Sequence, residues 1–369
     1  MNEVINIVMT VLMFALPPVF ALGVHVYLRH GEVSGRKRLI FLGFYFVLMN
    51  LITFGVSWIR GVKGLDLANM TMSYKIKYLG LGIVMGFVVP FVVCLVVEDQ
   101  ITLGGLKRYI RRFIGDFCKY FPYAIRAAKA DLKAEVKGSF LDWLWWMIEP
   151  FCSMIIYTII FGFVFNTSED YFPAFIFIGI TIWGFFSRSV NGAVNTVRSN
   201  KGIITKVYMP KYILLLSKML VNGFKMLVSF GVTAVLMIFL RVPIHYSIVF
   251  FIPIILVTFA FTFGVGTIMM HYGVFVNDLG YITGIVLNML MYLSGPFYAV
   301  GKRIPQPFGE ILEKFNPMAF LMSQTRNALL YGISPDWGML GIWAFISLAL
   351  VALGCFTVYH NENAYVKVI

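Results

Sequence analysis

The chain has 369 residues, of which 60% are hydrophobic and 13% are charged. Soluble globular domains have about 45–50% apolar and about 25% charged residues, so a soluble fold would leave much of this apolar surplus facing water. The composition therefore excludes an ordinary soluble protein and predicts an all-α integral membrane protein, because the bilayer is the natural solvent for long apolar helices.

The formal net charge is +13. The basic residues lie in the gaps between apolar stretches, where membrane topology places them. We therefore expect membrane lipids, or an anionic lipid headgroup, as the electrostatic partner and no nucleic acid. The four cysteines form no CxxC pair and the five histidines are scattered, so neither a disulfide framework nor a metal site is predicted.

Nine stretches are long and apolar enough to cross a bilayer, which requires about 20 residues. Three of them form an N-terminal membrane module within residues 1–103, at 4–28, 37–60 and 76–98. The other six form a core within residues 139–369, at 140–165, 172–195, 212–240, 246–273, 280–300 and 338–359.

The basic residues also orient these spans, because cytoplasmic loops carry an excess of Lys and Arg. The loop 29–38, the segment 99–137 and the loop 196–211 are all basic, and in a nine-span chain they fall on one side. This pattern predicts an external N-terminus and a cytoplasmic C-terminus. The loop 301–337 is then external. Its apolar stretches predict short re-entrant helices, and the alternative is a folded external cap.

Residues 104–138 separate the N-terminal module from the core. Apolar residues recur at helical spacing from Leu106 to Phe117, and basic residues fill the other face, as expected for a helix that lies in the cytoplasmic interface. Such a helix either anchors the topology or receives an anionic headgroup. The residues that we assign to the interface and the headgroup are Lys107, Arg108, Arg111, Arg112, Lys133 and Lys137.

Motifs for ATP hydrolysis or covalent catalysis are absent from the sequence, which has no Walker A, GxSxG or HExxH pattern. Energy for uphill transport would then come from a partner or an ion gradient. Ion coupling would need ionisable groups deep in the membrane, and the candidates are Glu149, Lys218 and Lys225. We expect Lys218 to extend to the interface; Glu149 and Lys225 would face a wet cavity or pair with each other.

Three patterns in the core are similar to the permease subunits of ABC-2 exporters, and most similar to those that move O-antigen, capsule and teichoic-acid polymers. The patterns are KGSFLDWLWWMIEPF from Lys137, KGIITKVYMPKY from Lys201, and a series from Asn277-Asp278-Leu279 through Tyr292 to Asn316-Pro317 and Arg326. The resemblance extends from about residue 120 to the end of the chain. Glu135-Val136 and Asp142 depart from the family pattern, and residues 1–103 are additional to it.

This resemblance implies a permease that binds no cofactor itself and works with a separate ABC ATPase, which binds ATP and Mg. It also implies pairing with a second copy of the chain, a lipid-linked glycan as substrate, and a multi-pass location in the bacterial cytoplasmic membrane. The expected ATPase-coupling residues are Lys201, Lys206, Tyr208, Pro210, Lys211, Asn277 and Asp278. Because sugars stack on aromatic faces, the expected channel-lining residues are Tyr157, Phe161, Trp183, Phe186, Tyr292, Phe297 and Tyr298.

Two other functions are consistent with the sequence. A membrane-embedded enzyme acting on lipid-linked sugars would need acids near the cytoplasmic surface, where Asp131, Glu135 and Asp142 are the candidates. An ABC-2 exporter of a small lipid or drug would have the same spans, and the accumulated cargo would distinguish it from a glycan exporter.

Overall fold

The computed structural model describes residues 38–47, 103–137, 142–164, 169–306, 308–362 and 365, with short runs and single positions between 11 and 36. The described residues form helices and turns, and none of them forms a strand. They divide into two compact units, 1–113 and 114–369. The predicted spans at 4–28, 37–60 and 76–98 lie wholly or largely outside the described residues, although a ten-residue apolar helix is described at Arg38–Val47.

In the described part of the chain, five helical segments are long and apolar enough to cross a membrane. All five coincide with predicted spans to within about five residues. They are α5 (Trp145–Tyr157) with its continuation η2 (Thr158–Val164), α6 (Phe172–Val194), α9 (Lys211–Phe239), η3 (Tyr246–Phe250) with α10 (Phe251–Phe275), and α15 (Trp337–His360).

The sixth predicted core span, 280–300, is shorter than expected. Helix α11 (Leu279–Ser294) has 16 residues and ends at Gly295, whose φ of +67° is left-handed. Glycine adopts this conformation at little cost and commonly ends helices. The chain then forms short helices: α12 (Val300–Arg303), α13 (Phe308–Phe315), α14 (Pro317–Arg326) and η4 (Asn327–Tyr331). The last three coincide with the apolar stretches of the predicted loop, and their re-entry into the membrane stays a prediction.

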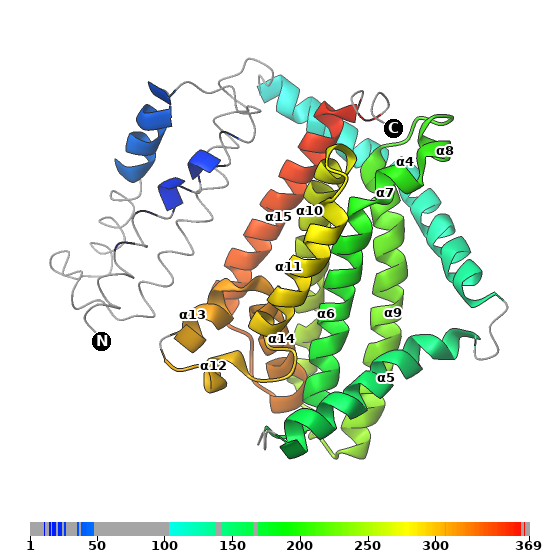
Figure 1. Cartoon of the computed structure of the whole chain (residues 1–369), viewed down its shortest axis with the longest axis vertical. Coiled ribbons are helices and arrows are strands. Elements are labelled where there is room, and N and C mark those ends of the chain that lie inside the picture. Colours follow the sequence, from blue (N-terminus) through cyan, green and yellow to red (C-terminus); the bar gives the residue numbers. More distant parts are fainter. Residues whose placement is uncertain are drawn as a thin grey trace. The chain divides into compact units, whose positions relative to one another are not determined.

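Helices α6, α9, α10, α11 and α15 stand side by side in the second unit (Figure 1), and α10 packs most extensively against α15 and α6. One end of this bundle carries α7 (Thr196–Ser199), α8 (Lys201–Ile204) and the end of α15. We call it the α8 end. The opposite end carries α12, α13 and α14 and is called the α13 end.

Several hydroxyl side chains are buried inside these apolar helices. Thr258, Thr262 and Thr357 each donate a hydrogen bond to the carbonyl four residues earlier, at 2.7–2.9 Å. A hydroxyl without a partner is costly in an apolar environment, and back-bonding to the helix supplies one. These polar residues are therefore compatible with membrane-spanning helices.

Helix α4 (Leu103–Val136) includes the predicted interfacial helix at 105–121 and continues beyond it, with Pro122 inside. From residue 114 onward it belongs to the second unit. The Tyr120 hydroxyl donates to the Tyr208 carbonyl at 3.4 Å, and Glu135 forms an ion pair with Lys225 at 2.5 Å. The last part of α4 thus lies alongside the first half of α9.

Of the two alternatives for Glu149 and Lys225, their pairing with each other is wrong. Lys225 bonds Glu135 and lies 5.8 Å from the Trp146 ring, whereas Glu149 is exposed on α5. The long α4 helix brings an acid to Lys225 that no sequence spacing indicated. The pair also gives Lys225 a structural role, because an ammonium within an apolar helix needs a partner.

Helices α10 and α15 approach closely at Gly264. A Cβ at this position would lie 2.6 Å from the Leu350 Cβ and 2.9 Å from the Val351 nitrogen. Gly354 of α15 is equally close to α10, because a Cβ at this position would lie 2.8 Å from the Thr267 Cβ. Small residues at such contacts let membrane helices pack through their backbones.

We predict that Gly264→Ala destabilises the protein by about 1–3 kcal/mol, the usual cost of overpacking. The measurement is the thermal unfolding midpoint of the purified protein in detergent. Gly341→Ala is the matched control, because a Cβ at Gly341 of α15 meets nothing within 4 Å. Alanine favours helix at an open position, so this control should leave the midpoint unchanged or raise it. Equal effects of the two substitutions would contradict the close contact.

Candidate functional site

A buried ion pair at the α8 end joins the start of α9 to the residues after α15. The Lys211 ammonium lies 2.9 Å from Glu362 and is only 4% exposed as a residue. The Tyr208 hydroxyl donates to the same carboxylate at 3.2 Å. Because Lys211 and Glu362 are 151 residues apart, no sequence pattern indicated this pair.

A second hydrogen-bonded chain lies beside this pair. The hydroxyls of Tyr212 and Tyr359 are 3.1 Å apart, and Tyr359 donates to Asp116 of α4 at 2.8 Å. Three helices are therefore connected through side chains at this end: α4, α9 and α15. None of the three residues was a candidate on sequence grounds, since each is an ordinary member of an apolar or amphipathic stretch.

The predicted coupling residues all lie at the α8 end, but they differ in exposure. Lys201, Lys206 and Tyr208 are exposed, while Pro210 and Lys211 are buried and support the connection from α8 to α9. Asn277 and Asp278 are exposed in the turn between α10 and α11. An Arg198 guanidinium nitrogen donates to the Val274 carbonyl at 2.9 Å, so this turn is held beside the loop that contains α8.

Five of the seven predicted channel-lining aromatics gather where η2 meets the end of α11. The Phe297 ring centroid lies 4.3 Å from Tyr157, 5.0 Å from Phe161 and 6.3 Å from Tyr292. The Tyr298 hydroxyl donates to the Tyr292 carbonyl. Phe297 is buried within the group, whereas Tyr292 is 60% exposed. One side of this aromatic group can therefore contact another molecule.

The other two predicted aromatics lie inside the bundle. Trp183 and Phe186 are each 6% exposed, and Phe186 stacks on Phe261 at 5.9 Å. They contribute to the contact between α6 and α10. A role for any of the seven in lining a pathway stays a prediction.

The predicted headgroup residues are described in part. Arg112, Lys133 and Lys137 are exposed, and the side chains of Lys107, Arg108 and Arg111 lie outside the described residues. Ala124 and Ala128 of the same helix are buried, so the basic side chains lie on the exposed side of α4. This distribution agrees with an amphipathic helix whose polar face contacts water or lipid headgroups.

Arg326 organises the α13 end. Its guanidinium donates three hydrogen bonds to backbone carbonyls, at 3.1 Å to Phe175, 3.1 Å to Gly295 and 2.6 Å to Pro296. The same group stacks on the Phe175 ring, 3.5 Å from its centroid. One side chain of α14 thus holds the first turn of α6 and the turn that follows α11.

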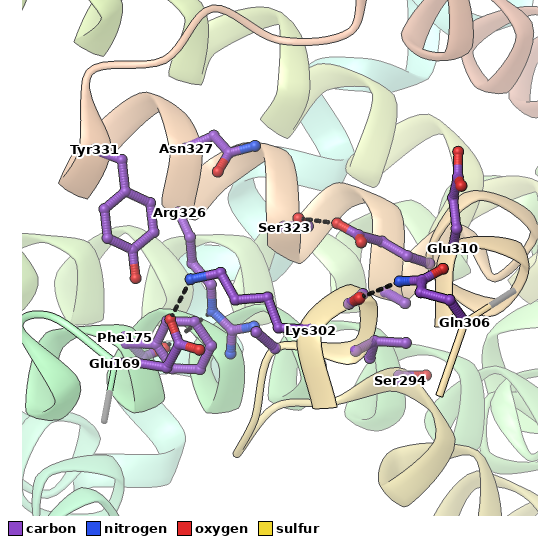
Figure 2. A pocket seen from close by; sticks show the side chains of 15 residues that line it. Glu169, Phe175, Ser294, Lys302, Gln306, Glu310, Ser323, Arg326, Asn327 and Tyr331 are labelled. Carbon is purple, nitrogen blue, oxygen red and sulfur yellow. Dashed lines mark hydrogen bonds and ion pairs between the residues drawn. The ribbon is translucent and has the colours of Figure 1, made fainter. Parts of the chain in front are cut away.

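A polar cavity of about 340 Å³ lies next to Arg326. Figure 2 shows Lys302 reaching Glu169 beside Tyr331, with Gln306 and Glu310 farther along the pocket. The Lys302–Glu169 distance is 2.8 Å, and the Lys302 ammonium lies 6.0 Å from the centroid of the Tyr331 ring. The cavity is lined by the residues before α6, the short helices α12 to α14, and η4, and it opens to the surface beside Lys302.

Burial shifts the pKa values of two residues that line this cavity. Burial lowers the pKa of Arg326 to about 9, so the guanidinium remains charged at neutral pH. Burial also raises the pKa of Tyr331 to about 12, with a further contribution from the Glu169 carboxylate. The Tyr331 hydroxyl therefore keeps its proton at neutral pH and is available as a hydrogen-bond donor.

Residues 127–330 match the family described as ABC-2 type transporter, over more than half of the chain. The chain belongs to this ABC-2 family. The family match includes α5, α6, α9, α10, α11 and the short helices of the α13 end. The resemblance inferred from the sequence is thereby confirmed.

Relatives within the ABC-2 family are named for polysaccharide export. The O-antigen export system permease protein RfbA of Myxococcus xanthus is 26% identical over 241 residues, which are 65% of this chain and 92% of that protein. A protein of the same name from Klebsiella pneumoniae is 26% identical over 63% of this chain and 90% of its own length. The polysialic acid transport protein KpsM of Escherichia coli is 23% identical over 61% and 87%.

We predict that Arg326→Lys destabilises this ABC-2 protein by about 2 kcal/mol. A single ammonium cannot reproduce the planar set of donors, and each buried carbonyl left without a partner costs about 1–3 kcal/mol. The thermal unfolding midpoint in detergent measures the effect. The control Arg303→Lys alters an exposed arginine at the same end and should leave the midpoint unchanged; equal midpoints for both variants would contradict the assigned role.

Proposed function

We propose that this chain is the membrane-spanning permease subunit of an ATP-driven exporter that moves a lipid-linked polysaccharide across the bacterial cytoplasmic membrane. The observation that carries the proposal is the alignment with relatives named for O-antigen export and polysialic acid transport over 87–92% of their length. Membership of the ABC-2 family supports transport, and the relatives' names support a glycan as its substrate.

Energy would come from a separate ABC ATPase that binds ATP and Mg, because the chain contains no Walker A motif. The exposed residues Lys201, Lys206 and Tyr208, with Asn277 and Asp278, form the surface that we assign to this partner. Pro210 and Lys211 lie beneath it. The Lys211–Glu362 ion pair would transmit movement of the α8 loop to the end of α15.

The orientation that we propose places the α8 end in the cytoplasm and the α13 end outside. Basic residues near α8 support this orientation through the positive-inside rule. Nine spans would then give an external N-terminus and a cytoplasmic C-terminus. Three of these spans belong to the module at 1–103, and α11 with its following turn supplies the fifth span of the six-helix core.

The pathway that we propose forms between two copies of the chain. Within one chain, only 6% of the residues in Trp145–Gly162 are buried, and α11 exposes several large apolar side chains. The partly exposed aromatic group around Phe297 joins these two segments. Aromatic faces suit a sliding glycan, because contacts between sugars and rings are only weakly directional.

Two alternative functions, an enzyme and an ion-coupled transporter, would need ionisable residues that are available for chemistry or ion binding. A membrane-embedded enzyme would use cytoplasmic acids, but Glu135 is paired with Lys225, and the side chain of Asp142 lies outside the described residues. Asp131 is exposed on α4. A transporter coupled to an ion gradient is also less well supported, because Glu149 and Lys225 do not form the ion pair considered for it.

Deletion of the gene in the native host tests the function. The expected result is loss of a surface glycan together with accumulation of its lipid-linked form inside the cell. Purification of the tagged chain in mild detergent should recover an ABC ATPase in stoichiometric amount. Accumulation of a small lipid instead of a glycan would overturn the substrate assignment, and recovery of the chain alone, under conditions that preserve other ABC complexes, would overturn ATP-driven export.

We predict that the double variant Lys201→Glu, Lys206→Glu reduces recovery of the ATPase at least about fivefold, because it reverses the charge of the proposed docking surface. The quantity measured is the ratio of ATPase to permease after purification. Arg241→Glu, Arg303→Glu is the matched control: it makes the same change in charge at two exposed arginines outside the α8 loop. A similar loss in both variants would contradict a docking role for the α8 loop.

A further inference from the structure

Three carboxylates line the cavity beside Arg326. Its carboxylates each make one polar contact through a single oxygen: Glu169 with Lys302, Glu310 with Lys314, and Glu313 with Ser323. The second oxygen of each has no hydrogen-bond or ion-pair partner among the described residues. The lining therefore suits a ligand that donates several hydrogen bonds.

The cations of this cavity are already engaged. Arg326 directs its donors to three backbone carbonyls, and Lys302 bonds Glu169. An anionic ligand would have to compete with these contacts while approaching three carboxylates. A metal ion is also disfavoured, because no group of three His, Cys, Asp or Glu side chains in the described part of the chain has the arrangement to hold one.

The Tyr331 hydroxyl provides a second, independent reason to expect a ligand in this cavity. Its hydroxyl is buried and has no hydrogen-bond partner among the described residues, and the residue lines the cavity. It is one of five buried side-chain oxygens without a partner in the described part of the chain, and of the five it is the one that belongs to a residue lining the cavity. The hydroxyl is covered in this conformation, and a rotation of the side chain that turned it into the cavity would let a ligand accept its hydrogen bond.

Free carboxylate oxygens, an unpartnered hydroxyl and an aromatic ring together match a polyhydroxylated neutral molecule. Sugar hydroxyls donate to the carboxylates and accept from Tyr331, and the C–H face of a sugar packs on a ring. The volume of about 340 Å³ lies at the small end of the range of about 300–1,000 Å³ for small-molecule pockets. It accommodates a short segment and not a long polymer.

We propose that this cavity is a binding site for a short neutral segment of a glycan, held by Tyr331 and the carboxylates of Glu310 and Glu313. The proposal rests on the function proposed above, since the glycan would be the exported polymer reaching the α13 end. Its affinity is expected to be weak, because a transport site must release what it binds. The site lies within one chain and is separate from the aromatic group around Phe297.

Binding can be measured by saturation-transfer NMR on the full chain, with its co-purifying partner, in lipid nanodiscs. The probes are the methyl glycosides of glucose, galactose, mannose and N-acetylglucosamine, with sialic acid and inorganic phosphate as anionic comparators. The expected result is saturable millimolar binding of at least one neutral glycoside. We expect binding to weaken about fivefold or more in Tyr331→Phe and in Glu313→Gln.

Tyr246→Phe is the matched control, because Tyr246 is 87% exposed and does not line the cavity. It should bind the glycoside as the natural chain does. The unfolding midpoint of Tyr331→Phe should be unchanged or higher, because the substitution removes an unpartnered buried hydroxyl. Weaker sugar binding without loss of stability would separate a binding role from a structural one.

Absence of saturable binding by every neutral glycoside would overturn the proposal. Unchanged affinity in both cavity variants, or tighter binding of sialic acid or phosphate at the same site, would also overturn it. The gene deletion distinguishes this failure from failure of the proposed function. If deletion abolishes the surface glycan but the cavity variants bind glycosides normally, only the cavity assignment fails; if deletion leaves the glycan intact, the export function fails.

Discussion

The need to give every buried backbone carbonyl a hydrogen-bond donor shapes the α13 end of the bundle. Helix α11 ends at Ser294, and the carbonyls of the turn that follows have no helical partner. Arg326 supplies the donors from α14 and joins that turn to α6. Because this one side chain positions α6, the turn and α14 together, the adjoining cavity also depends on it.

Polar contacts of a different kind hold the α8 end. There an ion pair and a chain of tyrosine hydroxyls connect α4, α9 and α15. Between the two ends, apolar helices pack through small residues, and several of their threonine hydroxyls bond the backbone of their own helix. The middle of the bundle is therefore apolar, as a lipid bilayer requires, and its two ends are polar. In our proposal the ATPase binds at the α8 end and the exported substrate leaves at the α13 end.

The family places the chain among membrane transporters, but the fold alone does not name a substrate. The substrate proposal depends on the names of relatives that are 23–26% identical and on chemistry that the bundle displays. Aromatic side chains gather around Phe297, and the α13 cavity offers acceptors and an unpartnered tyrosine hydroxyl. Both features suit sugars better than a purely apolar cargo.

The sequence by itself determined the membrane class, five of the core spans, the short helices after α11, and the ABC-2 family. These follow from long apolar runs, from helical periodicity and from local motifs. It did not determine which polar residues meet. The pairs Lys225–Glu135 and Lys211–Glu362, the three carbonyls bound by Arg326, and the surroundings of Tyr331 depend on packing between segments far apart in the chain. Periodicity identifies the face of a helix, but only the tertiary structure decides which other helix that face contacts.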